Sequence, residues 1–273
     1  MKLPWPCLEF QGCRSFLSPS SHIPSRITTT ERFEARPEKL SVNAKRFCCA
    51  AGFLAKSFTI EAMPSSEPKS AAAVKRWIDR HIRSSDRFAY IADKYEPHRK
   101  EHGCYDVYPS SNGPLIGALA AAAKPKRLLE VGCGLGYSAL WLAYGAGPRG
   151  NVETIEARKE HAKIARDHFK AEGLEKRIHV LVGEAARVLP ALDGRYELIY
   201  FDTDPGESLG VLNHSERLLR KGGLLISANL FLGQFAPDMP GLEKMAEYRL
   251  RILDADWWLT AYMADGTSVS VRV

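Results

Sequence analysis

The 273-residue chain has no apolar run that approaches the roughly 18 residues needed to cross a membrane. The sequence therefore predicts no membrane partner. Cysteine is also scarce outside the first 62 residues, since only Cys104 and Cys133 of the six cysteines lie beyond them. Two isolated cysteines do not make a disulfide framework, so we expect a reducing compartment and a cytoplasmic location.

A broad basic surface is missing from most of the chain. The formal net charge is +6, but residues 1–62 hold nine Lys and Arg against five Asp and Glu. The remaining residues carry 29 basic and 27 acidic side chains, so they are nearly neutral. A near-neutral domain lacks the electrostatic footprint of a nucleic-acid-binding protein, and we expect no nucleic-acid partner.

Residues 1–62 differ from the rest of the chain in composition. They are rich in Ser, Thr, Pro and Arg, and no helix or strand period persists through them. A transit-type presequence, a disordered extension and a start codon placed too early (Met63 opens a conventional sequence) are all compatible with this pattern. We expect an extension without a role in the fold, with organellar targeting left open, followed by one domain over 63–273.

From about residue 70, helices and strands follow a regular rhythm. Helical periodicity with Asn112-Gly113-Pro114 as punctuation predicts N-terminal helices over 70–123, followed by a core over 124–273. Strands then alternate with helices, which predicts an α/β fold with a doubly wound, mostly parallel sheet. The expected strands are Arg127–Val131, Val152–Glu156, Ile178–Val182, Leu198–Asp202 and Leu224–Ala228, and the expected helices cover 137–146, 158–172, 207–220 and 241–253.

The last part of the chain breaks this rhythm. Two strand-like runs, Trp257–Met263 and Thr267–Val273, flank Ala264-Asp265-Gly266, and Asp-Gly between such runs predicts an antiparallel hairpin. Just upstream of the fifth parallel strand, Lys221-Gly222-Gly223 is expected to close one helix and begin that strand. Trp257 and Trp258 are interpreted as core or edge packing.

The most informative segment runs from Glu130 to Ser138, with the sequence EVGCGLGYS. An apolar strand ends in three alternating glycines (Gly132, Gly134, Gly136), and a helix begins at Tyr137. Glycine is needed where the backbone turns with unusual dihedrals or lets a ligand approach. We therefore expect a nucleotide-like ligand at the carboxyl end of this strand. The spacing differs from the dinucleotide fingerprint G-x-G-x-x-G, which disfavours a nicotinamide-dependent oxidoreductase.

Acidic residues also stand at the ends of the following expected strands. Glu156 ends the second strand, Gly183-Glu184-Ala185 follows the third, and Asp202 ends the fourth. In an open α/β sheet, ligands bind at these carboxyl ends. An acid after the second strand can accept hydrogen bonds from both ribose hydroxyls, and Glu184 could accept one from an adenine amino group.

The pattern resembles the class I S-adenosylmethionine-dependent methyltransferases, and the region from about residue 105 to 273 is similar to the catechol/caffeoyl-CoA O-methyltransferase family. The resemblance is carried by EVGCGLGYSA at 130–139 and by four further segments: PSSNG at 109–113, YELIYFDTD at 196–204, LLRKGGLL at 218–225 and the Asp265-Gly266 turn. It implies a Rossmann-like, seven-stranded sheet whose hairpin supplies the last two strands. It also implies the cofactor S-adenosyl-L-methionine, a small-molecule methyl acceptor and, by analogy, a homodimer.

By this resemblance, each expected site residue takes a role. Glu130, Gly132, Gly134, Gly136, Tyr137 and Ser138 would line the methionine end of the cofactor. Glu156 and Ala157 would hold the ribose, Gly183, Glu184 and Ala185 the adenine, and Asp202 would lie beside the sulfonium centre. Acceptor specificity would come from the N-terminal helices and from Leu230–Gly241.

Two departures from the family concern catalysis. Pro205 stands where the family usually has a Lys that helps to deprotonate the acceptor, and Ala228-Asn229 stands where an Asp-Asn pair usually helps an Asp to bind Mg²⁺. Because Mg²⁺ needs oxygen ligands with carboxylate help, Asp202 and Asn229 make a poor site even if Asp204 contributes. We predict activity with little or no metal dependence and Asp202 or Asp204 as the base. An N-methyltransferase acting on a metabolite, protein or RNA, and a non-catalytic cofactor-binding protein, remain open alternatives.

Overall fold

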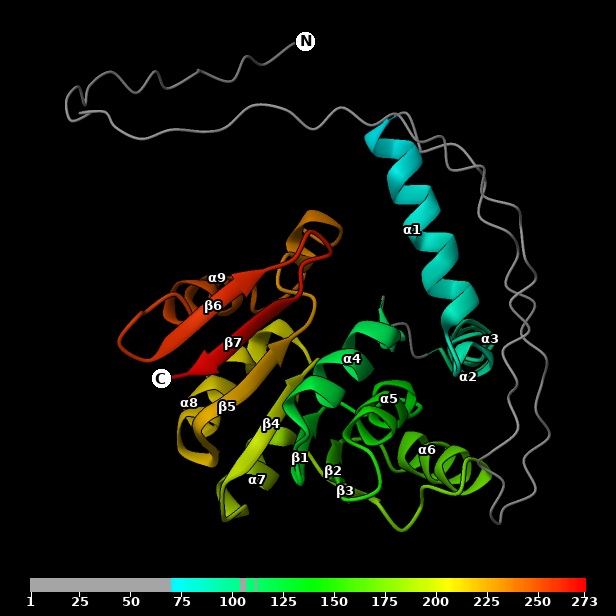
Figure 1. The fold of residues 1–273 in the computed structure, drawn as a ribbon, viewed down its shortest axis with the longest axis horizontal. Helices are drawn as coiled ribbons and strands as arrows, with labels where there is room; N and C mark the ends of the chain where they lie inside the picture. Colours follow the sequence, from blue (N-terminus) through cyan, green and yellow to red (C-terminus); the bar gives the residue numbers. More distant parts are fainter. Residues whose placement is uncertain (1–69, 104–106, 111) are drawn as a thin grey trace, which may run out of the picture. The chain divides into compact units, whose positions relative to one another are not determined.

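The computed structural model describes residues 70–103, 107–110 and 112–273. A seven-stranded sheet forms its centre, with the order β3-β2-β1-β4-β5-β7-β6 (Figure 1). The strands are β1 (Arg127–Val131), β2 (Asn151–Glu156), β3 (Ile178–Val182), β4 (Tyr196–Phe201), β5 (Leu219–Ser227), β6 (Trp258–Tyr262) and β7 (Ser268–Arg272). The α-helices are α1 (Ala71–Ser85), α2 (Ala89–Ala92), α3 (Tyr95–His102), α4 (Gly113–Ala123), α5 (Tyr137–Ala146), α6 (Lys159–Ala171), α7 (Ala185–Val188), α8 (Ser208–Leu218) and α9 (Leu242–Arg251).

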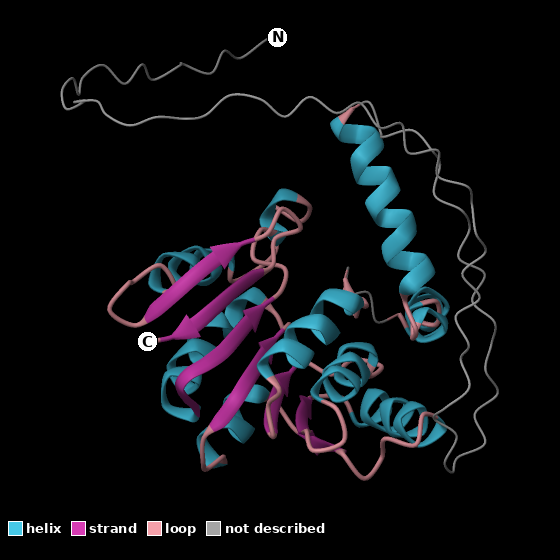
Figure 2. Ribbon diagram, viewed as in Figure 1, coloured by secondary structure: helices cyan, strands magenta, loops and turns pink. Residues whose placement is uncertain are grey.

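The strand directions confirm the predicted fold class. Strands β1 to β5 pair in parallel, whereas β7 runs antiparallel to β5 and β6 runs antiparallel to β7. Helices lie on both sides of the sheet (Figure 2). This is the doubly wound arrangement expected from alternating strands and helices, with the predicted hairpin appended at one edge. Trp258 is buried in the core, as interpreted from the sequence, while Trp257 is partly exposed.

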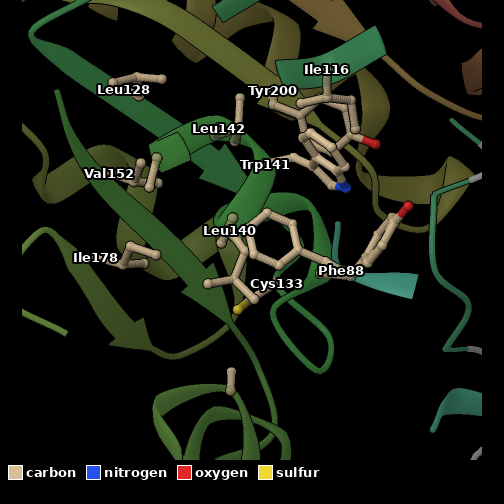
Figure 3. Packing of buried hydrophobic residues seen from close by; sticks show 14 of the residues in the cluster. Phe88, Ile116, Leu128, Cys133, Leu140, Trp141, Leu142, Val152, Ile178 and Tyr200 are labelled. Atoms are coloured by element: carbon tan, nitrogen blue, oxygen red, sulfur yellow. The ribbon is translucent and has the colours of Figure 1, made fainter. Parts of the chain in front are cut away.

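Two apolar clusters hold the layers together. Successive side chains of a strand point to opposite faces, so Leu128 joins the cluster beneath α4 and α5, whereas Leu129 joins the cluster beneath α8 and α9. Figure 3 shows the first cluster, in which Phe88 lies beside Trp141 of α5. Their ring centroids are 5.1 Å apart in an edge-to-face arrangement. Burying such large side chains stabilises the fold by about 1.5–3 kcal/mol each and anchors α2 to α5.

The N-terminal region forms helices α1, α2 and α3 before α4, within the range 70–123 over which the sequence predicts helices. Helix α1 ends at Ser85 and is followed by its C-cap residue Asp86, whose carboxylate accepts a hydrogen bond from the Phe88 backbone N–H at 2.9 Å. This local turn redirects the chain into α2. No helix in the described part of the chain combines the length and the apolar character of a membrane span.

One sequence expectation is wrong. The Lys221-Gly222-Gly223 segment does not close a helix, because α8 already ends at Leu218 and β5 begins at Leu219. Instead, β5 already pairs with β4 at Leu219, opposite Tyr196. The next pair is Leu198 with Leu224, so the register shifts there, and Gly222 and Gly223 lie in an irregularity inside β5. Gly222 has a φ of +71°, a left-handed conformation that glycine adopts readily.

Candidate active site

A cavity of about 660 Å³ lies at the carboxyl ends of the central parallel strands. The loops after β1, β2, β3, β4 and β5 all contribute to it, together with the segment before α4. This is where an open α/β sheet binds its ligands. Its walls are formed by Tyr95, Val107, Tyr108, Pro109, Val131, Gly132, Cys133, Gly134, Ser138, Ile155, Glu156, Ala157, Gly183, Ala185, Asp202, Thr203, Asp204, Pro205, Glu207, Asn229, Leu232, Phe235, Ala236 and Met239.

The glycine loop after β1 is held tightly between neighbouring strand ends. The backbone N–H groups of Gly132 and Cys133 both donate to the Ile155 carbonyl at 3.1 Å. Gly132 has a φ of +100°, and a Cβ atom on it would lie 2.0 Å from the Asp202 carbonyl oxygen. Glycine is therefore required at this position for two reasons, its dihedral angle and the close approach of β4. The loop and Asp202 form one continuous wall of the cavity.

Glu156 braces the same loop from the end of β2. Its Oε2 accepts a hydrogen bond from the Gly134 N–H at 2.7 Å, and its Oε1 accepts one from the Arg158 N–H at 2.9 Å. The His161 Nδ1 atom lies 3.5 Å from Oε1. The carboxylate is buried but reaches the cavity wall, with Ala157 beside it. A carboxylate fixed by backbone donors is well placed to accept further hydrogen bonds from ligand hydroxyls.

Glu130 lies behind the wall rather than in it. It is fully buried, and the Thr154 hydroxyl donates a hydrogen bond to its carboxyl group. Burial raises the pKa of Glu130 to about 8, and the negative charges of Asp202 and Glu156 act in the same direction. The hydrogen bonds from Thr154 and Ser138 oppose that rise. Glu130 does not line the cavity. Its hydrogen-bond partner Ser138 does, so Ser138 connects the buried carboxyl group to the cavity wall.

Gly136 and Tyr137 also lie outside the lining of the cavity. Gly136 has a φ of +92°, and a Cβ atom there would lie 2.6 Å from the Phe169 ring, so this glycine allows α5 and α6 to pack closely. The Tyr137 hydroxyl donates to Asp86 Oδ2 at 2.6 Å. The Tyr137 side chain, which is predicted to contact the methionine end of a cofactor, thus points toward the N-terminal helices.

The predicted adenine segment divides in the same way. Gly183 and Ala185 line the cavity, whereas the Glu184 side chain is exposed and forms an ion pair with Arg187 at 3.4 Å. Backbone and small side chains therefore form this wall. Glu184 is outside the lining, and its hydrogen bond with an adenine amino group stays a prediction.

Asp202 lines the cavity directly after the end of β4. Its Oδ1 accepts a hydrogen bond from Asn229 Nδ2 at 2.6 Å, and its Oδ2 accepts one from the Tyr200 hydroxyl at 3.3 Å. Burial raises the pKa of Asp202 to about 6, while these two hydrogen bonds act against the rise. Asp204 also lines the cavity but is exposed.

The donor set at this end of the cavity does not fit a divalent metal. The Asn229 amide donates its N–H to Asp202 Oδ1. This carboxylate oxygen, which a cation would need as a ligand, is therefore already hydrogen-bonded. The neighbouring Ala228 side chain has no donor atom, and within the part of the chain that the structure describes no three His, Cys, Asp or Glu side chains are grouped to hold an ion. Mg²⁺ requires several oxygen ligands in near-octahedral geometry.

Several lining residues were not named from the sequence. Glu207 follows β4 in a 3₁₀ turn (Pro205–Glu207), and burial raises its pKa above the ordinary value. The resemblance to the family implies that acceptor specificity comes from the N-terminal helices and from Leu230–Gly241. The structure places Tyr95, Val107, Tyr108 and Pro109 from the first region and Leu232, Phe235, Ala236 and Met239 from the second in the cavity wall.

Comparison with known proteins decides the family. The O-methyltransferase family matches residues 84–256, which is more than half of the chain. The chain belongs to this family. Among curated relatives, the catechol O-methyltransferase of Mycobacterium tuberculosis is 35% identical over 125 residues, which cover 45% of this chain and 57% of the relative. The match therefore spans little more than half of that relative's length.

Solved structures of O-methyltransferases share the fold. The O-methyltransferase TomG from Streptomyces achromogenes, solved in complex with S-adenosylmethionine, has a TM-score of 0.62 at 23% identity and covers 73% of this chain and 98% of its own. The O-methyltransferase from Bacillus cereus, solved in complex with S-adenosylhomocysteine, has a TM-score of 0.60 at 21% identity over 73% of this chain and all of its own. The resemblance drawn from the sequence is thus confirmed for family and fold.

Proposed function

We propose that this O-methyltransferase-family chain transfers a methyl group from S-adenosyl-L-methionine to a hydroxyl oxygen of a small aromatic acceptor. The observation that carries the proposal is the cavity in which the glycine loop, the Glu156 carboxylate and Asp202 share one wall. Family membership supports the reaction class, and the curated relative named for catechol supports the kind of acceptor.

The residues present fit the proposed cofactor. A Cβ atom on Gly134 would lie 3.3 Å from the Tyr95 hydroxyl, so the missing side chain leaves the loop open toward the cavity. In our proposal, Gly132, Gly134 and Ser138 contact the methionine end and Glu156 and Ala157 the ribose. Gly183 and Ala185 take the adenine. We assign Glu130, Gly136, Tyr137 and Glu184 supporting positions outside direct contact.

When bound, S-adenosyl-L-methionine supplies an electrophilic methyl group: its carbon–sulfur bond breaks as the bond to the acceptor oxygen forms, and S-adenosylhomocysteine leaves. The protein's part is to align the acceptor oxygen and to receive its proton. We assign proton acceptance to Asp202 because its carboxylate lines the cavity and is held there by hydrogen bonds from Asn229 and Tyr200. Asp204, at the exposed mouth, is the less suitable base.

We further propose that the reaction needs no divalent metal. Support comes from the donor chemistry, since Ala228 stands where the resemblance implies an Asp ligand, and Asn229 is already hydrogen-bonded to Asp202. The nearly neutral charge of residues 63–273 favours a small molecule over nucleic acid as partner. A homodimer and a cytoplasmic location stay predictions.

The decisive experiment combines binding and turnover on the full chain. Calorimetric titration with S-adenosylmethionine and S-adenosylhomocysteine is expected to show micromolar binding that Mg²⁺ does not change. Incubation with a catechol should then yield its methyl ether, detected by mass spectrometry, with equal rates in EDTA. Absence of binding by folded protein would overturn the function, and restoration of an EDTA-inhibited rate by Mg²⁺ would overturn the metal-free mechanism.

A matched variant separates catalysis from binding. Asp202→Asn keeps the size of the side chain but removes the basic carboxylate, so turnover should fall about a hundredfold or more while the affinity for S-adenosylhomocysteine, which has no sulfonium charge, stays within a few-fold. Full activity of this variant would show that another group takes the proton. A panel of amines should also be tested as acceptors. If amines are methylated on nitrogen and no hydroxyl compound is methylated on oxygen, the acceptor group is an amine and not a hydroxyl.

A further inference from the structure

Leu135, which lies between the last two glycines of the loop after β1, is held through both of its backbone polar groups. Its N–H donates to the Tyr95 hydroxyl of α3 at 3.0 Å. Its carbonyl oxygen lies 2.8 Å from His168 Nδ1 of α6. All three residues are buried. Two helices that are distant in sequence thus fix one residue of the glycine loop.

Lys94, the neighbour of Tyr95 in sequence, reaches the same residue through His168. Its Nζ lies 3.0 Å from His168 Nε2. An ammonium group can only donate, so Nε2 accepts, and the ring proton is on Nδ1, which donates to the Leu135 carbonyl. Lys94 and Tyr95 at the beginning of α3 therefore hold Leu135 from two sides. We call Lys94, Tyr95 and His168 the loop clamp.

The loop clamp acts where the glycine loop could otherwise change its shape. Gly134 and Gly136, on either side of Leu135, have φ values of +53° and +92°, and glycine adopts other conformations at little steric cost. The Gly134 N–H donates to Glu156 at 2.7 Å, and Gly134 lines the cavity. A rotation of the peptide groups of Leu135 would therefore move the part of the loop that faces the proposed cofactor.

The contact between Lys94 and His168 requires a neutral imidazole. Burial lowers the pKa of His168, and the charge of Lys94 acts in the same direction, while the hydrogen bond to Leu135 and the charge of Asp167 oppose the decrease. A second ring proton, on Nε2, would place two cations at the distance that now separates donor and acceptor. Protonation of His168 therefore breaks its link to Lys94. Tyr95 stays neutral, because burial raises the pKa of its hydroxyl group.

Other titratable groups in this region have partners of their own. Tyr90 of α2 donates to the Glu172 carboxylate that follows α6, and Arg87 lies 3.6 Å from the same carboxylate. Cys133 is the titratable side chain of the glycine loop, and burial raises the pKa of its thiol. Protonation of the His168 ring is thus the step that changes the charge of the loop clamp.

We propose that Lys94 and His168 are positioning residues for the cofactor, which hold the glycine loop in its binding shape while His168 is neutral and loosen it when His168 is protonated. This assignment rests on the proposed methyltransferase function and adds a control of cofactor affinity by pH. Both residues act through Leu135, since neither lines the cavity. Cofactor binding favours the neutral ring, so affinity should fall as the pH falls through the His168 pKa, which lies below the ordinary 6.5.

The test compares the full chain with its Lys94→Met variant by calorimetric titration with S-adenosylhomocysteine at about pH 7.5 and about pH 5.0. Lys94 is exposed, so this substitution leaves the core intact. Lys163→Met, which removes an exposed cation from α6, is the matched control. Because Asp202 titrates in the same range, the informative quantity is the ratio of the two dissociation constants, variant to wild type, at each pH.

Lys94→Met should bind about three- to tenfold more weakly than the wild type at the higher pH, the cost of one lost hydrogen bond. At the lower pH the ratio should fall to about one or below, because the wild type has lost the same link. Lys163→Met should give a ratio near one throughout. His168→Asn, whose amide can still donate to Leu135 but cannot titrate, should follow Lys94→Met. In turnover assays Lys94→Met should raise the KM for S-adenosylmethionine and leave kcat unchanged, a split that a general loss of stability does not produce.

Hydrogen exchange without cofactor tests the loop clamp separately. Peptides that cover residues 130–138 should exchange faster in Lys94→Met than in the wild type at the higher pH and at equal rates at the lower pH. Comparison of the two proteins at one pH cancels the intrinsic pH dependence of exchange. A ratio of dissociation constants that does not change with pH, or equal exchange at the higher pH, would overturn the proposal. Faster exchange in the variant, with no binding of S-adenosylhomocysteine by folded wild type, would support the loop clamp and overturn the proposed function.

Discussion

The Tyr137 hydroxyl donates a hydrogen bond to the Asp86 carboxylate at 2.6 Å, joining the first helix after the glycine loop to the junction between α1 and α2. Tyr137 is nearly fully buried, and its ring also lies against Gly113 at the start of α4, where a Cβ atom would be 2.3 Å from the hydroxyl oxygen. This contact holds the N-terminal helices, which supply part of the cavity wall, on the sheet domain.

Tyr137→Phe should therefore reduce stability without reducing cofactor affinity. A hydrogen bond to a charged partner contributes about 1.5–3 kcal/mol, so we expect the free energy of unfolding in urea to fall by about that amount. The dissociation constant for S-adenosylhomocysteine should change by less than about twofold, since the ring does not line the cavity. Tyr144→Phe, an exposed position on the same helix, is the control. A large loss of affinity with unchanged stability would return Tyr137 to the cofactor site.

Gly132→Ala is predicted to be far more damaging than Gly173→Ala. Both glycines have positive φ, but a Cβ atom on Gly132 would lie 2.0 Å from the Asp202 carbonyl oxygen, whereas one on Gly173 would meet nothing within 4 Å. Gly173→Ala should cost only the left-handed strain of about 1–2 kcal/mol. Gly132→Ala must also displace the backbone of the glycine loop or of β4, and should abolish cofactor binding. Urea unfolding and calorimetry on both variants test this, and equal effects would exclude the close approach as the cause.

Glu156→Gln should weaken binding of S-adenosylmethionine by about 1–3 kcal/mol, the cost expected for losing a charge-assisted hydrogen bond at a buried site. The Gln side chain keeps one oxygen acceptor for the Gly134 N–H, but its amide nitrogen cannot accept from the Arg158 N–H, so the thermal midpoint should fall slightly and is measured together with the affinity. Glu160→Gln, an exposed acid in the first turn of α6, is the control and should bind normally. Unchanged affinity in Glu156→Gln would remove this residue from the proposed ribose site.

Much of the fold could be predicted because local signals and tertiary pairing agree along most of the sheet. β1 and α5 begin and end at the predicted residues, since Pro125 precedes β1 and glycines follow it, and Gly136 and Gly147 stand on either side of α5. β5 begins earlier than predicted, because its first residue pairs with β4 across an irregularity that contains Gly222 and Gly223. The two glycines give a turn signal locally, and only the neighbouring strand shows that the chain continues as a strand.

The predicted positions that line the cavity are those that backbone geometry determines, whereas the positions of the other residues depend on the direction of their side chains. The lining positions Gly132, Gly134 and Asp202 follow from strand ends, which the sequence marks clearly. Tyr137 adjoins them in sequence, yet its hydroxyl group binds a residue 51 positions away, which no local pattern encodes. Glu207 and Phe235 lie in segments without periodicity, so their positions in the cavity wall follow only from the tertiary structure.

Glu130 makes the stability of the fold depend on pH. Its folded pKa is raised to about 8 from an ordinary 4.5, mainly by burial, so between these values the folded state holds a proton that the unfolded state has lost. The free energy of unfolding should therefore fall as the pH rises from about 4.5 to about 8, and this contribution should be constant above that range. In Glu130→Gln the side chain cannot ionise, so the variant lacks this pH-dependent contribution to the free energy of unfolding.

Urea unfolding of the wild type and of Glu130→Gln at pH 5.5 and at about pH 8.5 measures this contribution. Because other groups titrate in the same range, the informative quantity is the difference between the two proteins at each pH. We expect that difference to shift in favour of the variant by on the order of 1–4 kcal/mol between the two conditions, since a tenfold change in proton affinity corresponds to about 1.4 kcal/mol. Glu175→Gln, at an exposed position, should follow the wild type. Parallel curves for wild type and Glu130→Gln would mean that the buried carboxyl group has an ordinary pKa and that its hydrogen bonds from Thr154 and Ser138 fully compensate its burial.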